Sequence, residues 1–180
     1  MTTASIITLL RIALIPFFMV SQRLGWLDGY VALVIFILAS LTDSLDGYVA
    51  RRYNQISTFG KFIDPLADKL LVCSAILILV AEDILPAWIA MIILARDFIV
   101  TSLRLIAVGS GKVISAHLSG KVRTTVNVIF IVLYLSPIFH MDWWPGDVLD
   151  PTIQLTMAAV SIWSCIDYLA RNWKVLDFKS

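Results

Sequence analysis

Six runs of mostly apolar residues, each about 20 residues long, follow one another along the chain and constrain its fold more than any other feature. A helix of that length crosses the hydrocarbon core of a bilayer. Of the 180 residues, 59% are hydrophobic, which is well above the share in soluble domains. Because the connections are short, we expect one all-α domain over residues 1–180, an integral membrane bundle of six transmembrane helices. The runs lie near residues 4–21, 30–51, 61–81, 85–107, 115–140 and 151–171.

Basic residues between the runs predict the orientation. If the N-terminus is cytosolic, most Lys and Arg residues outside the runs fall on the cytosolic side, whereas the other side holds Arg23 and several carboxylates. This bias follows the positive-inside rule and predicts a multi-pass protein of the cytoplasmic (inner) membrane with both termini cytosolic. The first run has no basic segment before it and contains Arg11, so we expect no cleaved signal peptide.

Four aspartates interrupt the second and third runs. Asp43 and Asp46 are spaced i, i+3, and Asp64 and Asp68 are spaced i, i+4, so each pair lies on one face of its helix. A carboxylate inside a bilayer costs about 2.5–3.5 kcal/mol on insertion scales, and four neighbouring anions repel one another. Divalent cations or protons must compensate them, and a metal site is the leading prediction.

Other charged residues lie at a similar depth inside the runs. Most of them fall within about a dozen residues of a cytosolic helix end, which is the inner half of the bilayer at about 1.5 Å per residue. A polar cavity that opens to the cytosol would explain this depth. These residues are Arg11, Lys69, Arg96, Asp97, Lys121, Arg123 and Asp167, in addition to the four aspartates.

The aspartates belong to a longer pattern. It reads Asp43-x2-Asp46-Gly47-x2-Ala50-Arg51, then eight residues, then Gly60-x3-Asp64-x3-Asp68. Gly47, Gly60 and Ala50 leave room for a bulky ligand, and Arg51 offers a planar set of donors to phosphate. The pattern resembles the signature of the CDP-alcohol phosphotransferase family at every defined position.

This resemblance implies transfer of a phosphoryl group from CDP-diacylglycerol to an alcohol, with release of CMP. It implies that Asp43, Asp46, Asp64 and Asp68 hold two divalent ions, Mg²⁺ or Mn²⁺, which suit hard oxygen ligands. Asp68 would also be the catalytic base. Family members resemble homodimers, so a homodimer is expected. The residues expected at the CDP-lipid are Thr8, Gly47, Ala50, Arg51 and Gly60.

The acceptor alcohol is suggested by a second region. Arg96-Asp97-x3-Thr101-x2-Arg104 and Gly120-Lys121-x-Arg123-Thr124 resemble the phosphatidylglycerophosphate synthase branch of the family, which uses sn-glycerol 3-phosphate. Thr8 and Arg11 also resemble the start of that branch, although its usual upstream Asn is absent. A dianionic acceptor needs cationic partners. We expect them to be Arg96, Arg104, Lys121, Arg123 and Arg11.

Several alternatives remain open. Arg104 is equally explained as an interfacial anchor, Arg96 and Arg11 as members of buried ion pairs, and Asp97 as a partner of a neighbouring helix. The same chemistry with serine, inositol phosphate or phosphatidylglycerol as acceptor would leave the basic residues partly unexplained. A carboxylate-based cation or proton transporter is a rival of another class, but it gives no reason for the glycine and alanine spacing. A formal net charge of +1 with dispersed basic residues argues against nucleic-acid binding.

Overall fold

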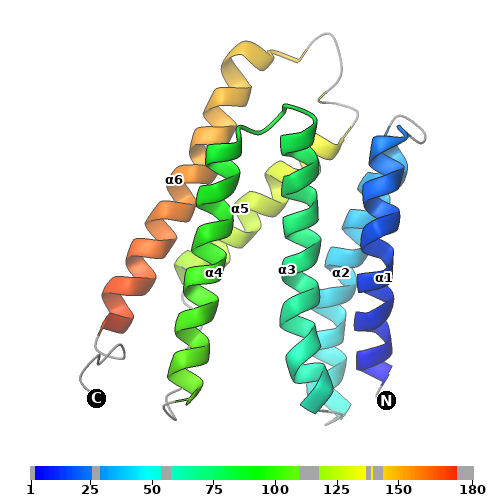
Figure 1. The fold of residues 1–180 in the computed structure, drawn as a ribbon, viewed down its shortest axis with the longest axis vertical. Helices are drawn as coiled ribbons and strands as arrows, with labels where there is room; N and C mark the ends of the chain where they lie inside the picture. Colours follow the sequence, from blue (N-terminus) through cyan, green and yellow to red (C-terminus); the bar gives the residue numbers. More distant parts are fainter. Residues whose placement is uncertain are drawn as a thin grey trace. The chain divides into compact units, whose positions relative to one another are not determined.

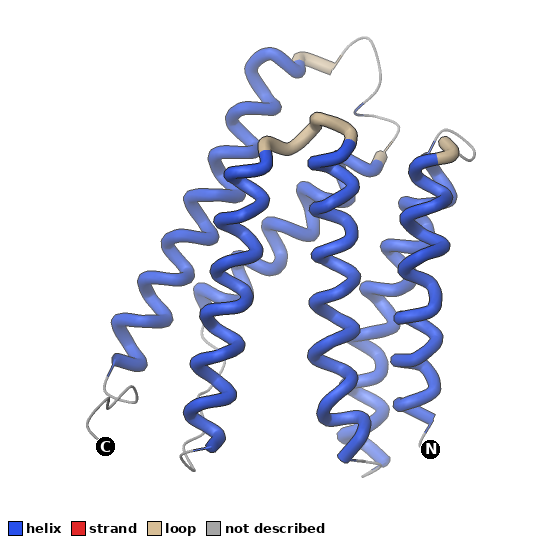
Figure 2. Tube along the Cα trace, in the orientation of Figure 1, coloured by secondary structure: helices blue, strands red, loops and turns tan. Residues whose placement is uncertain are grey.

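The computed structural model describes the backbone of residues 3–25, 29–53, 58–109, 118–136, 139 and 144–173. It describes the side chains of residues 8–25, 29–42, 66–67, 69–107, 118–136, 139 and 144–173. Within these ranges the chain forms six helices and no strand, which confirms the all-α prediction (Figures 1 and 2). The helices are α1 (Thr3–Arg23), α2 (Tyr30–Tyr53), α3 (Thr58–Ala81), α4 (Ala87–Gly109), α5 (Leu118–Leu135) and α6 (Gly146–Asn172).

The predicted runs differ from the helices mainly at two ends. Helix α5 stops at Leu135 rather than residue 140, because Pro137 follows and disfavours helical geometry in the residue before it. Helix α6 begins at Gly146 rather than residue 151, since its first turns contain Asp147 and are too polar to belong to an apolar run. Asp147 lies where a helix dipole favours negative charge. Hydropathy therefore found the six helices and missed a polar first turn.

Two of the described helices, Leu118–Leu135 and Gly146–Asn172, are long and apolar enough by length and composition to cross a membrane. Among the residues whose side chains are described, α2 and α3 contribute shorter apolar stretches, Tyr30–Thr42 and Lys69–Ala81. Helix α4 carries three charged residues, Arg96, Asp97 and Arg104. Membrane crossing by all six helices stays a prediction.

The chain divides into two compact units. Unit 1 comprises residues 1–84 and 131–144, and unit 2 comprises residues 85–130 and 145–180. In unit 1, helix α1 packs against α2 and α3 (Figure 1), and the rings of Phe18 and Phe36 lie 5.9 Å apart between their centroids. Ala32, Ala39 and Ala75 are buried, and such small side chains let helices approach closely.

Helix α3 ends in a Schellman motif. The amide of Ile84 donates to the carbonyl of Leu79 at 3.0 Å, and that of Asp83 donates to Val80 at 3.2 Å. Asp83 has φ 57°, the left-handed conformation that this motif requires at its central position. The cap satisfies two carbonyls at the end of the helix and fixes where α3 stops.

In unit 2, helices α4 and α6 form the main packing pair, and the first part of α5 contributes polar contacts to both. Ile89, Ile93, Met157 and Ala158 are among the buried apolar residues of these two helices. The same helices also bury several polar and charged side chains, among them Arg96, Ser161 and Ser164.

Candidate active site

The four aspartates lie on two helices of unit 1 that contact each other. Asp43 and Asp46 lie in the second half of α2, and Asp64 and Asp68 in the first half of α3. Both helices are continuous through these positions, including Pro65, so the i, i+3 and i, i+4 spacings hold along each helix. The four side chains lie outside the described set, as do those of Gly47, Ala50, Arg51 and Gly60.

The donor set at these positions suits a hard divalent cation. It offers carboxylate oxygens from two adjacent helices, and no thiol or imidazole occurs between residues 43 and 68. Mg²⁺ and Mn²⁺ prefer such oxygen ligands, whereas structural zinc sites use Cys and His. These residues therefore fit divalent ions by their chemistry.

Thr8 and Arg11 lie one turn apart on α1, and both are buried within unit 1. Thr8 is 1% exposed and Arg11 is 2% exposed, and each takes part in interactions within the protein. A guanidinium buried this far does not reach the surface as an interfacial anchor would.

Asp97 is the centre of a charged network in unit 2. Nη1 of Arg123 lies 2.7 Å from Oδ1 of Asp97, and Nη2 of Arg123 donates a hydrogen bond to Oδ2 at 2.9 Å. The two contacts form a bidentate ion pair between α4 and α5. Nη1 of Arg96 lies 3.3 Å from Oδ1 of the same carboxylate. Nη2 of Arg123 also donates to the carbonyl of Ile93 at 3.2 Å. The alternative that Asp97 is a partner of a neighbouring helix is confirmed.

Helix α6 completes this network. Nη2 of Arg96 donates to Oγ of Ser164 at 2.7 Å, and Nε of Arg104 donates to the hydroxyl of Tyr168 at 3.3 Å. The Arg104 guanidinium carbon also lies 5.7 Å from the centroid of the Tyr168 ring, within the range of a cation–π interaction. The basic residues of α4 are thus held by side chains more than 60 positions away in sequence.

A second carboxylate joins α5 to α6 near the start of α5. Oγ of Ser119 donates to Oδ2 of Asp167 at 2.5 Å, and Nε of Arg171 lies 2.6 Å from Oδ1. Next to Ser119, an added Cβ on Gly120 would lie 3.5 Å from Nη2 of Arg96, so this small residue lies directly beside the guanidinium.

The groups of contacts around Asp97, Tyr168 and Asp167, referred to together as the unit 2 network, carry an excess of positive charge. They contain four guanidinium groups (Arg96, Arg104, Arg123 and Arg171) and two carboxylates (Asp97 and Asp167), which is two cations more than anions. The Nε atoms of Arg96 and Arg123 are buried and make no hydrogen bond. Lys121 is exposed beside them in sequence. Of the five predicted acceptor-phosphate residues, Arg96 and Arg123 are brought together on Asp97, and Arg104 contacts Tyr168 of α6. Lys121 adjoins Arg123 in sequence, and Arg11 belongs to unit 1.

From α6, sequence reasoning placed only Asp167 in the expected polar cavity and assigned no role to Ser164 or Tyr168. Ser164, Asp167 and Tyr168 contribute to the network from a helix that was recognised only by its hydropathy. One signal was present, because Ser164 and Asp167 are polar, lie i, i+3 apart and share one face of an otherwise apolar run.

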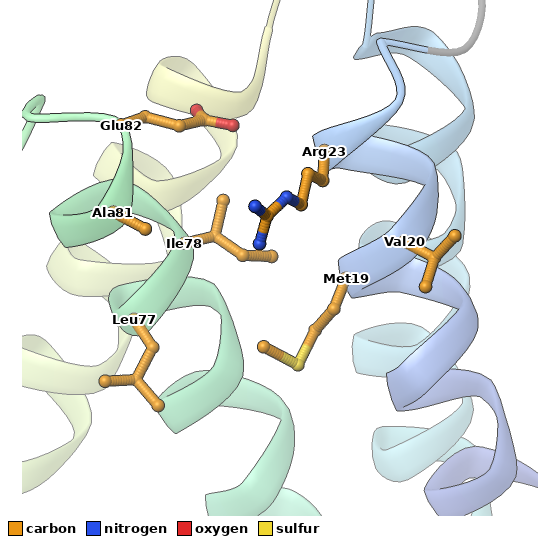
Figure 3. A pocket seen from close by; sticks show the side chains of 7 residues that line it. All are labelled: Met19, Val20, Arg23, Leu77, Ile78, Ala81 and Glu82. Carbon is orange, nitrogen blue, oxygen red and sulfur yellow. The ribbon is translucent and has the colours of Figure 1, made fainter.

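A cavity in unit 1 lies away from the aspartates. It has a volume of about 660 Å³ between the ends of α1 and α3 and is lined by Met19, Val20, Arg23, Leu77, Ile78, Ala81 and Glu82. Figure 3 shows the Arg23 side chain directed into the space between these helices. Asp68 lies nine residues before Leu77, the nearest lining residue on α3, or about 13.5 Å along the helix axis. This cavity is therefore separate from the predicted metal site.

Comparison with known proteins decides the family. The model of CDP-alcohol phosphatidyltransferases matches residues 1–166. This chain belongs to the CDP-alcohol phosphatidyltransferase family. The family is a membrane-embedded enzyme family that generally depends on divalent metal, and the enzyme and family predictions are confirmed.

Individual members of the CDP-alcohol phosphatidyltransferase family match nearly the whole chain. The CDP-diacylglycerol–glycerol-3-phosphate 3-phosphatidyltransferase of Bacillus subtilis is 40% identical over 186 residues, which is 94% of each chain. The enzymes of the same name from Sodalis glossinidius and Yersinia enterocolitica are 38% and 37% identical. The former alignment covers 91% of this chain and 90% of its relative, and the latter covers 94% of each.

Proposed function

We propose that this enzyme transfers the phosphatidyl group of CDP-diacylglycerol to sn-glycerol 3-phosphate, giving phosphatidylglycerol phosphate and CMP. The names of the relatives support this reaction. The observation that carries the choice of acceptor is the cationic excess of the unit 2 network, with unbonded Nε donors on Arg96 and Arg123. A phosphorylated acceptor brings a dianion that compensates this excess, whereas serine brings no phosphate.

The carboxylates of Asp43, Asp46, Asp64 and Asp68 would hold two Mg²⁺ or Mn²⁺ ions, which would neutralise the pyrophosphate and favour the departure of CMP. Thr8, Gly47, Ala50, Arg51 and Gly60 would bind the CDP-lipid. In that role Arg51 donates to a phosphate oxygen, and the small residues admit the nucleotide.

Asp68 is the proposed base. Its carboxylate takes the proton of the primary hydroxyl of glycerol 3-phosphate as that oxygen attacks the phosphorus bearing diacylglycerol. The new P–O bond forms as the bond to the CMP oxygen breaks. The proton ends on Asp68, and the electron pair leaves with CMP.

The acceptor phosphate would contact Arg96, Arg104, Lys121, Arg123 and Arg11. Asp97 and Ser164 hold Arg96, and Tyr168 holds Arg104, so these groups are oriented before the acceptor arrives. Preorganised donors lose less conformational entropy on binding than free side chains do. Lys121 is exposed and suits the capture of an anion from solution.

In the membrane, we propose a single catalytic domain over residues 1–180. Six crossings with both termini and the polar cavity facing the cytosol would let CDP-diacylglycerol enter from the bilayer and glycerol 3-phosphate from the cytosol. A homodimer is the expected assembly. The cytosolic excess of Lys and Arg in the sequence supports this orientation.

The decisive experiment measures CMP release by the purified protein in detergent, with CDP-diacylglycerol and Mg²⁺ or Mn²⁺. Glycerol 3-phosphate, serine, inositol phosphate and phosphatidylglycerol are supplied one at a time. Release with glycerol 3-phosphate alone, abolished by a chelator and restored by added Mg²⁺, is expected. Release with another alcohol would reject the acceptor, and release in the presence of chelator would reject the metals. Ion flux through proteoliposomes that contain the protein, with no release of CMP, would instead favour the alternative of a cation or proton transporter.

A further inference from the structure

Two buried polar side chains in unit 2 have no partner, although neither belongs to the predicted site. Both the Nδ2 and Oδ1 atoms of Asn127 on α5 lack a hydrogen bond, and so does Oγ of Ser161 on α6. Asn127 is 2% exposed and Ser161 is 0% exposed. A buried polar group without a partner costs about 1–3 kcal/mol, so an unsatisfied amide and hydroxyl need a reason.

The contacts between α5 and α6 show where these two residues lie relative to the arginines. At one level, Ser119 of α5 bonds Asp167 of α6. One turn further along both helices, Arg123 and Ser164 are joined through Arg96 and Asp97. The next turn in the same direction brings Asn127 on α5 and Ser161 on α6.

The spacing within each helix supports this order. The α5 residues Ser119, Arg123 and Asn127 follow one another at i+4, and the α6 residues Asp167, Ser164 and Ser161 follow one another at i−3. Residues at these spacings share one helix face. The amide of Asn127 therefore lies one turn beyond Arg123 on α5, and the hydroxyl of Ser161 lies one turn beyond Ser164 on α6, about 4.5–6 Å along each helix axis. We refer to these two groups as the Asn127–Ser161 layer.

The chemistry of this layer matches the part of the acceptor that is not phosphate. An amide offers two donors and one acceptor oxygen, and a serine hydroxyl offers one donor and two lone pairs. They bear no charge, so they bind a neutral polar group. A secondary hydroxyl adjacent to a phosphate ester, which both donates and accepts, satisfies an amide and a serine together.

We propose that Asn127, assisted by Ser161, binds the secondary hydroxyl of the acceptor and is a specificity-determining residue. This inference rests on the proposed function, because it assumes a glycerol phosphate whose phosphate lies on Arg96 and Arg123. Asn127 and Ser161 would select an acceptor with two adjacent hydroxyl groups, whereas Arg96 and Arg123 would bind its phosphate. An acceptor that lacks the secondary hydroxyl leaves the amide buried and unbonded, and the enzyme rejects it for that reason.

The test compares two acceptors in two enzymes. Glycerol 3-phosphate and 3-hydroxypropyl phosphate, which lacks only the secondary hydroxyl, are each supplied with CDP-diacylglycerol, and kcat/KM is obtained from CMP release. In the unaltered enzyme we expect the ratio to favour glycerol 3-phosphate at least thirtyfold. Asn127→Leu, which keeps the branched shape of the side chain and removes the amide, is expected to reduce that ratio at least tenfold. The KM for CDP-diacylglycerol should not change.

Two further variants separate specificity from structure. Thr125→Val makes a comparable polar-to-apolar change at an exposed position of the same helix and should leave the ratio unchanged. Ser161→Ala should reduce the ratio by a few-fold. If Asn127→Leu does not give folded protein, the unaltered enzyme and Ser161→Ala carry the test.

The outcomes are distinct. Turnover of glycerol 3-phosphate with less than threefold discrimination in the unaltered enzyme would overturn the inference and leave the proposed function standing. An Asn127→Leu enzyme with lower activity but an unchanged ratio would do the same, since it would show a merely structural role. No turnover of glycerol 3-phosphate by the unaltered enzyme would overturn both.

Discussion

The two charged regions of this protein balance their charge in opposite ways. In unit 1, α2 and α3 carry four aspartates within 26 residues of sequence, from position 43 to 68, with Arg51, Arg52 and Lys61 as the basic residues between them. In unit 2, two carboxylates lie within hydrogen-bonding or ion-pair distance of guanidinium groups from three helices. The segment from Asp43 to Asp68 concentrates negative charge, whereas the unit 2 network pairs both of its carboxylates internally and keeps a positive excess.

This difference suits the two regions to different tasks, phosphoryl transfer in unit 1 and binding of the acceptor in unit 2. A cluster of four carboxylates gains much from bound metal ions, which suits transfer of a charged phosphoryl group. Guanidinium groups that are already held by carboxylates and hydroxyls keep a fixed geometry, which suits recognition of a small dianion. We therefore expect substitutions in unit 1 to reduce turnover and those in unit 2 to change stability or acceptor binding.

The largest effect expected from this contrast is in unit 1. Asp68→Asn should lower turnover by about 10²–10⁴-fold, because it removes the proposed base, while CDP-lipid binding largely remains. CMP release and CDP-lipid binding measure the two properties. Asp83→Asn is the matched control, because Asp83 is exposed at the end of the same helix and its φ of 57° suits Asn. Normal turnover by Asp68→Asn would remove it as the base.

In unit 2, the corresponding loss of a carboxylate should act first on folding. Asp97→Asn should reduce the free energy of unfolding by about 3–5 kcal/mol, because it leaves Arg96 and Arg123 buried without their counter-charge. Thermal or chemical unfolding in detergent measures the loss. Asp147→Asn at the exposed start of α6 should cost less than about 1 kcal/mol. Equal losses would mean that Asp97 does not balance the network.

Acceptor binding gives a smaller effect. Lys121→Ala should raise the KM for glycerol 3-phosphate by about tenfold with little change in kcat, since an exposed lysine that captures the anion adds ground-state binding. Steady-state kinetics at varied glycerol 3-phosphate concentration measures both constants. Arg23→Ala, an exposed cation on α1 in unit 1, should change neither. An unchanged KM in Lys121→Ala would move the acceptor site elsewhere.

The smallest effect tests the link between α5 and α6. Ser119→Ala should cost about 1 kcal/mol of stability, because it removes one hydrogen bond to a carboxylate that Arg171 still pairs. The unfolding midpoint in detergent measures it. Thr124→Ala removes only an exposed bond within α5, to the carbonyl of Gly120, and should cost less than about 0.5 kcal/mol. If Ser119→Ala cost no more stability than Thr124→Ala, the Ser119 bond would not stabilise the contact between α5 and α6.

Most of the helical architecture was predictable because it depends on local composition. Each apolar run overlaps a helix of the structure, and the errors at residues 140 and 151 arise where a proline or a polar turn changes the end of a helix. The family was also predictable, since its signature lies within one continuous segment of 26 residues from Asp43 to Asp68.

The unit 2 network was predictable only in part. Its basic residues were visible because charge inside an apolar run is costly. Their partners could not be predicted, because Arg96 bonds Ser164, which is 68 positions away in sequence, and Arg104 bonds Tyr168, which is 64 positions away. Such pairings depend on how helices pack, and a serine or tyrosine in an apolar run looks ordinary. The roles assigned to Asn127 and Ser161 likewise required knowing which polar atoms have no partner.

The Asp97–Arg123 pair also bears on how the chain enters the membrane. Taken separately, α4 would insert with Asp97 and α5 with Arg123, each at a cost of about 2.5–3.5 kcal/mol. A helical hairpin that enters with the carboxylate and guanidinium already bonded hides both charges from the lipid. We therefore expect α4 and α5 to insert together, and an insertion assay in which α4 alone inserts as well as the pair would contradict this. Asp97, which orients Arg96 and Arg123 in the folded enzyme, would then also determine that α4 and α5 enter the membrane as a pair.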